Sequence, residues 1–498
     1  MVHTPGWWKE WRQRRQARSL HKKLHRRLEH SGGVRQLILN NVRLHEGAIQ
    51  SISDSIQDSY RGDCYSGSQL KTLTVKDCFL KDNDTIRVLI NLMQSQIGNL
   101  ERVALVNNTL DASRPLNTTQ LNKFVDALGV VQHITIGPEF MSLESTKALY
   151  ALCFRAVTLH LVNFPFGFEN DEQEDGLPRQ VPPSIRLCGL YKGIKSKECR
   201  VQTLILQGSL VDDNRFALLV DAMQEVQAST PASAKSSNLT VKHLKLMGHC
   251  LHSRSCDIFI RLMGANLGLE SIEIAYCAFL SSIKDGQAQE MGAILARDTC
   301  LTDFALREVH LTDTLAIPLF HALQFNNTLL HLTITTRFLN SRLERFPPVS
   351  TTGYRALVEV LPGLTRLQTL HLGRDFYFSS RMVSSSNLTF VADTTDAINR
   401  NGSILNYEGG EVSSGTVANH VRYGHYHEII PPCMERNRAS LVATSMLLVA
   451  YDVNFSAAAW HAAILHMAAK PERQSALFQI LHRVLTDPQV PLRSQKGP

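Results

Sequence analysis

Apolar residues recur along the chain at one spacing: an apolar residue, two variable residues, a second apolar residue, one variable residue and a third apolar residue. About twelve such triplets occur, with first members separated by roughly 23 to 47 residues, as in repeat proteins. The last two positions alternate as in a β strand. The triplets are Val34/Leu37/Leu39, Leu70/Leu73/Val75, Leu100/Val103/Leu105, Val131/Ile134/Ile136, Phe154/Val157/Leu159, Val201/Leu204/Leu206, Val241/Leu244/Leu246, Leu269/Ile272/Ile274, Leu301/Phe304/Leu306, Leu329/Leu332/Ile334, Leu367/Leu370/Leu372 and a degenerate Ile404/Tyr407/Gly409.

A helical pattern follows the strand in several units. Apolar residues then recur every three or four positions, as in the run Phe216, Leu219, Val220 and Met223. One strand and one helix cannot bury their apolar faces alone, so the units are expected to stack. We therefore predict an α/β solenoid with parallel inner strands and outer helices, curved into a horseshoe. An ordinary α/β protein shares the strand–helix alternation but does not predict the same apolar spacing about twelve times.

Segments such as LKTLTVKDCFLKDNDTIRVLINLM and VQTLILQGSLVDDNRFALLVDAM resemble leucine-rich repeats of the ribonuclease-inhibitor type. The resemblance covers about residues 34–410. The consensus asparagine, three residues past the last apolar strand position, is met by Asn108 and nearly by Asn41, while Cys78 and Cys277 are the cysteine alternative. The resemblance implies a leucine-rich-repeat solenoid that binds another protein and catalyses no reaction.

Three regions are expected from these patterns. Residues 1–32 form a basic N-terminal helix or arm, residues 33–412 the repeat domain, and residues 413–498 a helical C-terminal cap rich in Ala and Leu. A long insertion near 165–199 contains an acidic, proline-containing stretch, which predicts an exposed loop. This loop is either a tolerated insertion or a second place for a partner to bind.

The formal net charge of +7 is concentrated at the N-terminus, because residues 9–27 contain nine Lys or Arg and one Glu. One interpretation is a polar helix that caps the first repeat. The other is an arm that binds nucleic acid or an anionic surface. Its cations are Arg12, Arg14, Arg15, Arg18, Lys22, Lys23, Arg26 and Arg27.

The ten cysteines are scattered singly, without zinc-module spacing, which favours core thiols in a reducing compartment. Neither a secretory signal nor an apolar stretch long enough for a transmembrane segment is recognisable. We therefore expect an intracellular protein, cytoplasmic or nuclear.

Sequence motifs for catalysis are not found: there is no phosphate-binding glycine loop, no GxSxG and no HExxH. Two groups contain metal-ligating residue types without a recognised ligand spacing. They are His420, His425, His427 and Cys433, and His249, Cys250, His252 and Cys256. We predict no enzyme activity, no catalytic residue, no cofactor and no metal site.

The candidate binding surface is the concave face, where residues between the inward apolar ones must point. We predict that a protein partner of unknown identity contacts this face or the loops. The candidate contact residues are Thr72, Thr74, Lys76, Arg102, His133, Thr135, Thr203, His243, Lys245, Glu273, Asp303, Arg307, His331 and His371. These residues form no continuous track of cations, which disfavours nucleic acid on this face.

Overall fold

The structure is a computed structural model of the 498-residue chain. It describes residues 35–408 apart from 45, 62–69, 81–82, 97, 107, 111–117, 138–145, 163–186, 209–210, 229–239, 249–250, 252, 278, 310, 337–348, 365, 373–396, 398–399 and 402–405. The chain divides into two compact units, Met1–Phe279 and Leu280–Pro498, which are described separately. The expected N-terminal arm and C-terminal cap lie outside the described residues.

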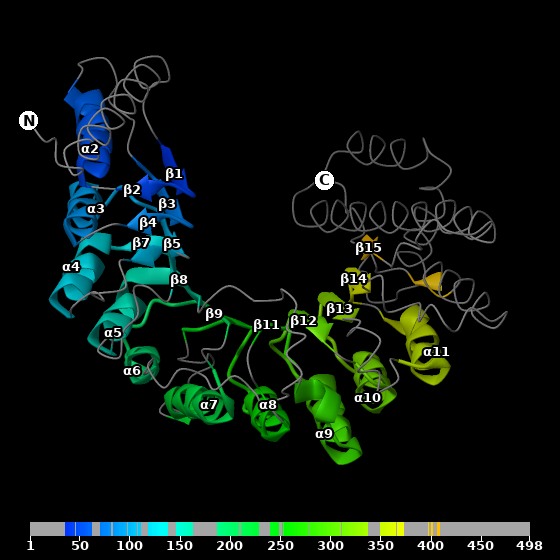
Figure 1. The fold of residues 1–498 in the computed structure, drawn as a ribbon. Helices are drawn as coiled ribbons and strands as arrows, with labels where there is room; N and C mark the ends of the chain where they lie inside the picture. The colour runs from blue at the N-terminus through cyan, green and yellow to red at the C-terminus, as the bar shows by residue number, and fades with distance from the viewer. Residues whose placement is uncertain are drawn as a thin grey trace, which may run out of the picture. The chain divides into compact units, whose positions relative to one another are not determined.

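The first unit contains eight parallel strands, one for each described repeat (Figure 1). Each strand pairs with the strand of the next repeat, so spatial order follows chain order. The strands are β1 (Gln36–Asn40), β3 (Thr72–Lys76), β5 (Arg102–Val106), β7 (Val131–Ile136), β8 (Ala156–Val162), β9 (Thr203–Gln207), β10 (His243–Met247) and β11 (Ser271–Ala275). Three short strands, β2 (Arg43–Leu44), β4 (Phe79–Leu80) and β6 (Thr109–Leu110), form a small second sheet.

The helices of the first unit lie along one side of its sheet (Figure 1). They are α2 (Glu46–Arg61), α3 (Asn83–Ser95), α4 (Thr118–Leu128), α5 (Thr146–Arg155), α6 (Cys188–Lys195), α7 (Asp213–Ala228) and α8 (Arg254–Gly264). Their apolar stripes face the sheet, and Phe216, Leu219 and Val220 are fully buried. No described helix combines the length and the apolar character that crossing a membrane requires.

The second unit repeats the same arrangement. Its strands are β12 (Asp303–Val309), β13 (His331–Thr336), β14 (Thr369–Leu372) and β15 (Asn406–Glu408), again parallel and in chain order. Its helices are α9 (Asp285–Arg297), α10 (Asp313–Leu323) and α11 (Thr351–Val360), and two short 3-10 helices are η2 (Phe279–Ser282) and η3 (Leu361–Gly363).

The predicted triplets supply the core. Leu70, Leu73 and Val75 of the second repeat have no exposed surface, and the other triplet residues whose burial is described are similarly buried outside the first and fifth repeats. In the first repeat Leu37 is buried, whereas Leu39 is partly exposed. In the register of the sheet, each inward residue lies beside its equivalent in the next strand, as Leu73 lies beside Val103. The predicted fold class is therefore confirmed: the chain is an α/β leucine-rich-repeat solenoid with one strand and one helix in each unit.

In the fifth repeat the predicted triplet Phe154/Val157/Leu159 is wrong. Phe154 and Val157 are partly exposed, whereas Ala156, Leu159 and Leu161 are fully buried. Helix α5 ends at Arg155 and β8 begins at the next residue. Because no turn separates helix from strand, Ala156 at the start of β8 faces the core, and the inward-facing set lies two residues later than the hydrophobic pattern indicated.

The segment 165–199, expected as an insertion, includes the helix of its own repeat. Helix α6 occupies residues 188–195 and packs between α5 and α7. Its Tyr191 is buried, and the hydroxyl donates a hydrogen bond to the carbonyl oxygen of Arg215 at 2.9 Å. The acidic residues Glu169, Asp171, Glu172, Glu174 and Asp175 precede this helix in the sequence and lie outside the described residues.

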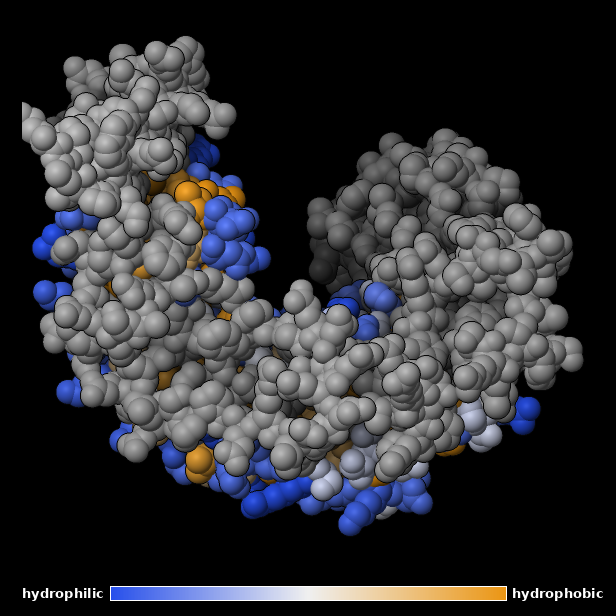
Figure 2. All heavy atoms as spheres, in the orientation of Figure 1, coloured by the Kyte–Doolittle hydropathy of each residue, from blue (hydrophilic) through white to orange (hydrophobic). Residues whose placement is uncertain are grey.

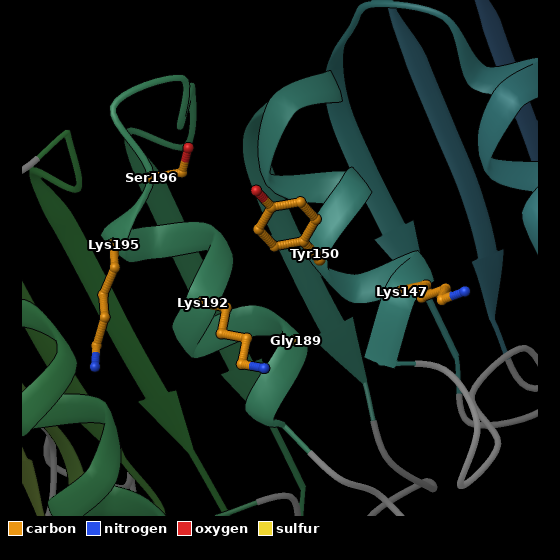
Figure 3. A pocket seen from close by; sticks show the side chains of 6 residues that line it. All are labelled: Lys147, Tyr150, Gly189, Lys192, Lys195 and Ser196. Carbon is orange, nitrogen blue, oxygen red and sulfur yellow. The ribbon is translucent and has the colours of Figure 1, made fainter.

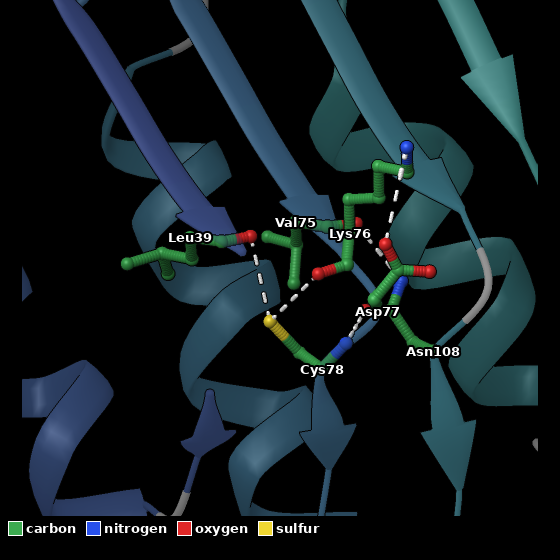
Figure 4. Close-up of polar contacts among 6 residues, drawn as sticks. All are labelled: Leu39, Val75, Lys76, Asp77, Cys78 and Asn108. Carbon is green, nitrogen blue, oxygen red and sulfur yellow. Dashed lines mark hydrogen bonds and ion pairs between the residues drawn. The ribbon is translucent and has the colours of Figure 1, made fainter. Parts of the chain in front are cut away.

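Buried polar side chains join neighbouring repeats just past the strand ends (Figure 4). The amide of Asn108 donates to the carbonyl oxygen of Val75 at 2.9 Å and accepts from the backbone N–H of Cys78 at 3.1 Å. Cys78, at the equivalent position one repeat earlier, directs its thiol at the carbonyl oxygens of Leu39 and Lys76. Asn108 and Cys78 therefore form hydrogen bonds with backbone groups near the ends of the strands. Asn41, the other residue near the consensus asparagine position, is exposed.

The residue two positions after the last inward strand residue repeatedly adopts a left-handed backbone. This holds for Asn41, Asp77, Gly208, Gly248 and Tyr276, with φ between 53° and 84°. The left-handed residue turns the chain away from the sheet, and its N–H often bonds to a carbonyl oxygen of the next strand. The N–H groups of Gly208 and Gly248 do so at 2.7 Å each.

Buried amides also close the helix-to-strand turns of the second unit. The Asn326 amide donates to the carbonyl oxygen of Leu295 at 2.6 Å and accepts from the backbone N–H of Leu329 at 2.7 Å. Asn401 donates to the carbonyl oxygens of Leu361 and Leu364 at 2.6 and 2.8 Å. Both side chains therefore serve carbonyl oxygens where a helical segment of the preceding repeat ends: Leu295 lies in the last turn of α9, and Leu361 and Leu364 lie in and just after η3.

The substitution Asn108→Ala is expected to lower the free energy of unfolding by about 2 kcal/mol or more, because two buried backbone groups lose their partner. Asn108→Cys is expected to lower it less, since the Cys78 thiol serves carbonyls from the equivalent position. Chemical denaturation measures both. Asn91→Ala, at an exposed site on α3, is the control and is expected to change stability by less than about 0.5 kcal/mol. Equal losses for Asn108→Ala and Asn91→Ala would contradict the role given to the amide.

Replacing Gly208 or Gly248 by Ala is expected to destabilise the first unit by roughly 1 kcal/mol each. The left-handed backbone costs a side chain about 1–2 kcal/mol, partly offset because glycine loses more entropy on folding. Thermal unfolding measures the effect. The matched control is Gly286→Ala in the first turn of α9, where a Cβ meets no atom within 4 Å and a neutral or stabilising effect is expected. A destabilisation there as large as at Gly208 would rule out the conformational explanation.

Candidate functional site

The side of each sheet opposite the helices, here called the strand face, carries the predicted contact residues. In the first unit they alternate with buried residues, since Thr72 and Thr74 flank Leu73 and are half-buried. Of the other predicted residues in this unit, Lys76 and Arg102 are exposed and Glu273 is buried. The half-buried ones are His133, Thr135, Thr203, His243 and Lys245.

The parallel register arranges these side chains in two rows across the strands. The first row runs Thr72, Arg102, His133, Thr158, Thr203, His243 and Ser271. The second runs Thr74, Ala104, Thr135, His160, Ile205, Lys245 and Glu273. Neighbouring strands lie about 4.8 Å apart, so each row presents a side chain at regular intervals. Rigid spacing of this kind suits recognition of an extended surface.

Two side-chain contacts cross strands in the middle of this face. His160 Nε2 on β8 lies 2.9 Å from Gln207 Oε1 on β9. Lys245 Nζ on β10 lies 2.7 Å from Glu273 Oε2 on β11, and the carboxylate side chain is 12% exposed. The ion pair partly neutralises the cation, so this part of the face is polar with little net charge.

Two histidines of these rows, His133 and His160, favour the neutral form. Burial lowers the pKa of His160, and the nearby Lys245 charge lowers it too, while the hydrogen bond to Gln207 acts in the opposite direction. Burial, followed by the positive charge of Arg102, also lowers the pKa of His133. Near neutral pH both imidazoles therefore offer one donor and one acceptor and carry no charge.

The first strands differ from the middle of the face. Lys76 and Arg102 are exposed cations there, and Ile38 on β1 is 56% exposed. Hydrophobic atoms reach the surface beside these strands (orange in Figure 2). This end thus combines positive charge with apolar surface, whereas hydrogen-bonding groups dominate from β7 to β11.

The second unit places its predicted residues on its own strand face. Asp303 lies beside His331 in the register, and His371 lies beside Thr333. Arg307 lies where the register between β12 and β13 shifts, between Leu306 and Val309. β12 continues to Val309 here, and the left-handed Glu308 forms part of the irregularity.

Several predicted features lie outside the described residues. They include the basic arm, the group His420, His425, His427 and Cys433, and three members of the second group, His249, Cys250 and His252. Cys256, the fourth member, is buried, and its thiol donates to the carbonyl oxygen of Phe279 at 3.2 Å. Burial raises the pKa of Cys256 to about 11, so the thiol stays protonated at neutral pH. Within the described part of the chain, no three His, Cys, Asp or Glu side chains form a metal-binding group.

The fold and the strand face together define the class of molecule: a leucine-rich-repeat solenoid with rows of polar side chains along its sheet. Neither a protein-family model nor a curated protein sequence matches the chain. Solved structures show similarity at low identity. The leucine-rich repeat-containing protein LegL7 of Legionella pneumophila is 13% identical over 78% of this chain and 97% of its own, with a TM-score of 0.37.

Two further solved structures are similar at the same level. One is the yeast complex of Rad7 and Elc1, with 13% identity over 84% of this chain and 97% of the matched chain and a TM-score of 0.38. The other is actin-binding site 2 of leiomodin-1, with 14% identity over 33% of this chain and 83% of the matched chain and a TM-score of 0.25. At these values the likeness carries no information about function or partners.

The pKa of His160 is expected to respond in opposite directions to its two neighbours. Lys245→Met removes a positive charge and is expected to raise it, while Gln207→Leu removes a hydrogen bond and is expected to lower it. Ring-proton chemical shifts followed against pH measure both. Lys123→Met on α4, exposed and away from the strand face, is the control and is expected to leave the titration unchanged. Shifts of the same sign for the Lys245 and Gln207 variants would contradict the electrostatic account.

Proposed function

We propose that the chain is a non-catalytic scaffold that binds a partner protein through the strand face of its first unit. The main support is the regular presentation of side chains from β7 to β11 in two rows, which are polar apart from Ile205 and half-buried apart from the buried Glu273. Such side chains are held in place by the buried residues that alternate with them. The entropy lost when they bind a partner is correspondingly small.

The chemistry of this face favours a polar protein surface as the partner. His133 and His160 are neutral hydrogen-bonding groups near neutral pH, because burial lowers the pKa of each. Lys245 is paired with Glu273, so few charges are left for electrostatic attraction. A nucleic-acid backbone needs a run of cations, and the residues from β7 to β11 do not supply one.

We also propose that the chain works in a reducing compartment inside a cell. The buried thiols of Cys78, Cys256 and Cys277 donate to backbone carbonyl oxygens, a role that needs them reduced. Cysteines used in this way are small core residues.

The test introduces bulk and charge into the rows without touching the core. Thr135→Arg combined with Thr203→Arg places two long cations among half-buried side chains of β7 and β9. We expect affinity purification from the cells that produce the chain, followed by quantitative mass spectrometry, to recover a protein that this double variant loses more than tenfold. The partner would be lost because the rows no longer match its surface.

The matched control is Gln94→Arg, which adds the same side chain at an exposed site on the outer helix α3. This variant is expected to retain the partner, and both variants are expected to keep the wild-type circular dichroism spectrum. Equal recovery of every bound protein by wild type and the double variant would refute binding through the strand face.

A further inference from the structure

A groove lies between α5 and α6 on the outer, helix-covered side of the first unit (Figure 3). Its volume is about 540 Å³, and it is lined by Lys147, Tyr150, Gly189, Lys192, Lys195 and Ser196. The Tyr150 ring points from α5 toward α6, with Lys192 nearby on α6. Three lysines and a half-exposed aromatic ring thus surround one opening.

The two helices that form the groove carry only positive charge. Lys147 and Arg155 are the charged residues of α5, and Lys192 and Lys195 are those of α6. Neither helix contains Asp or Glu. No ion pair can therefore bridge α5 and α6 directly, although they pack closely against each other.

Other neighbouring helices of this unit are bridged by pairs of opposite charge. Arg87 on α3 bonds to Glu46 on α2 at 3.2 Å, and Arg261 on α8 bonds to Asp221 on α7 at 2.8 Å. Helices α5 and α6 form such pairs with the helices on their other sides, α4 and α7. Arg155 lies 3.7 Å from Asp126 on α4, and Lys195 pairs with Glu225 on α7.

After these pairs are formed, two positive charges remain on α5 and α6. Among the described residues, Lys147 and Lys192 have no ion-pair partner, and both are exposed. Asp126 on α4 and Glu225 on α7 place a carboxylate on either side of the groove helices. A long polyanion would meet those acids, whereas a short acidic segment would not.

The floor of the groove is firm and partly apolar. A Cβ on Gly193 would lie 2.5 Å from the Sγ atom of the buried Cys153, so the close approach of α5 and α6 depends on this glycine. Tyr150 is 41% exposed, and its ring meets the edge of Phe154 with centroids 4.7 Å apart. The exposed part of the Tyr150 ring offers apolar surface in the groove that the three lysines also line.

From this combination we infer that the groove between α5 and α6 binds a short acidic peptide segment of a partner protein, with carboxylates on Lys147 and Lys192 and an apolar or aromatic side chain on Tyr150. The carboxylates would supply the negative charge that α5 and α6 lack. The apolar side chain would cover the exposed ring. This site lies on the side of the sheet opposite the strand face and is independent of the function proposed for that face.

The probe is a fluorescent peptide with a central phenylalanine flanked by glutamates, and binding to the full chain is followed by anisotropy. Lys192→Glu is expected to weaken binding on the order of tenfold, which corresponds to about 1.4 kcal/mol. Tyr150→Ala is also expected to weaken it. Added salt is expected to reduce the affinity for the wild type, because the groove lysines are exposed.

The matched control is Lys123→Glu, the same charge change at an exposed site on the outer helix α4. It is expected to bind within about twofold of the wild type. The strand-face variant Thr135→Arg with Thr203→Arg is also expected to bind normally, so failure of one proposal can be told from failure of the other. Equal unfolding midpoints for all variants establish that the fold is intact.

Three outcomes would overturn the inference. The first is equal binding of a peptide with glutamine in place of glutamate, or unchanged binding after Lys192→Glu. The second is an equally tight, Lys192-dependent interaction with single-stranded oligothymidylate, which would assign the groove to nucleic acid. The third is a tenfold gain in peptide affinity after Glu172→Gln with Glu174→Gln, which would make the chain's own acidic segment the occupant.

Discussion

Lateral stacking of buried strand residues is the constraint on which the rest of the structure depends. In the second and third repeats, Leu73 and Val75 lie beside Val103 and Leu105 with almost no exposed surface. A repeat taken alone would expose these side chains, and burying one aliphatic side chain contributes about 1.5–3 kcal/mol. The parallel register therefore follows from the triplets, and it also sets where every intervening side chain lies. Thr72, Thr74 and their equivalents form rows because the residues between them are buried.

Stacking leaves backbone groups at the strand ends that need partners, and the repeats meet this need in different ways. Asn108 satisfies two backbone groups with one amide, whereas the Cys78 thiol reaches two carbonyl oxygens. Gly208 and Gly248 adopt the left-handed turn without a side chain, while Tyr276 adopts it with one. The repeats therefore differ most at positions where more than one residue type can bond to the same carbonyl oxygen or adopt the same turn. The leucine positions have no such alternative and are retained along the chain.

This difference explains which features could be predicted from the sequence. The strands and the outer helices follow from a spacing that recurs about twelve times, and the strand-face residues follow by alternation. The prediction for the fifth repeat was wrong because α5 runs directly into β8. Two overlapping sets have the same apolar spacing there, Phe154/Val157/Leu159 and Ala156/Leu159/Leu161, and the second set is the buried one. Contacts such as that of His160 with Gln207 could not be predicted, because they depend on the register between two strands that are about 40 residues apart in the sequence. The hydrogen bonds of the buried Asn326 and Asn401 amides lie in helix-to-strand turns, outside the apolar spacing from which the repeats were predicted.

The two sides of the first unit differ in how they balance charge, and this difference argues for different ligands. On the strand face, Lys245 pairs with Glu273 of the same surface, and burial lowers the pKa of His133 and of His160, which favours their neutral form. Binding there must rely on shape and hydrogen bonds, which favours a partner with a matching folded surface. On the helix side, α5 and α6 contain no acid, and the acids of α4 and α7 are already engaged by Arg155 and Lys195. Lys147 and Lys192, unpaired among the described residues, favour an acidic ligand in the groove. That ligand is expected to be short, because a longer polyanion would also approach Asp126 and Glu225. The two proposed contacts would lie on opposite sides of the sheet, so neither would disturb the buried residues of the strands between them.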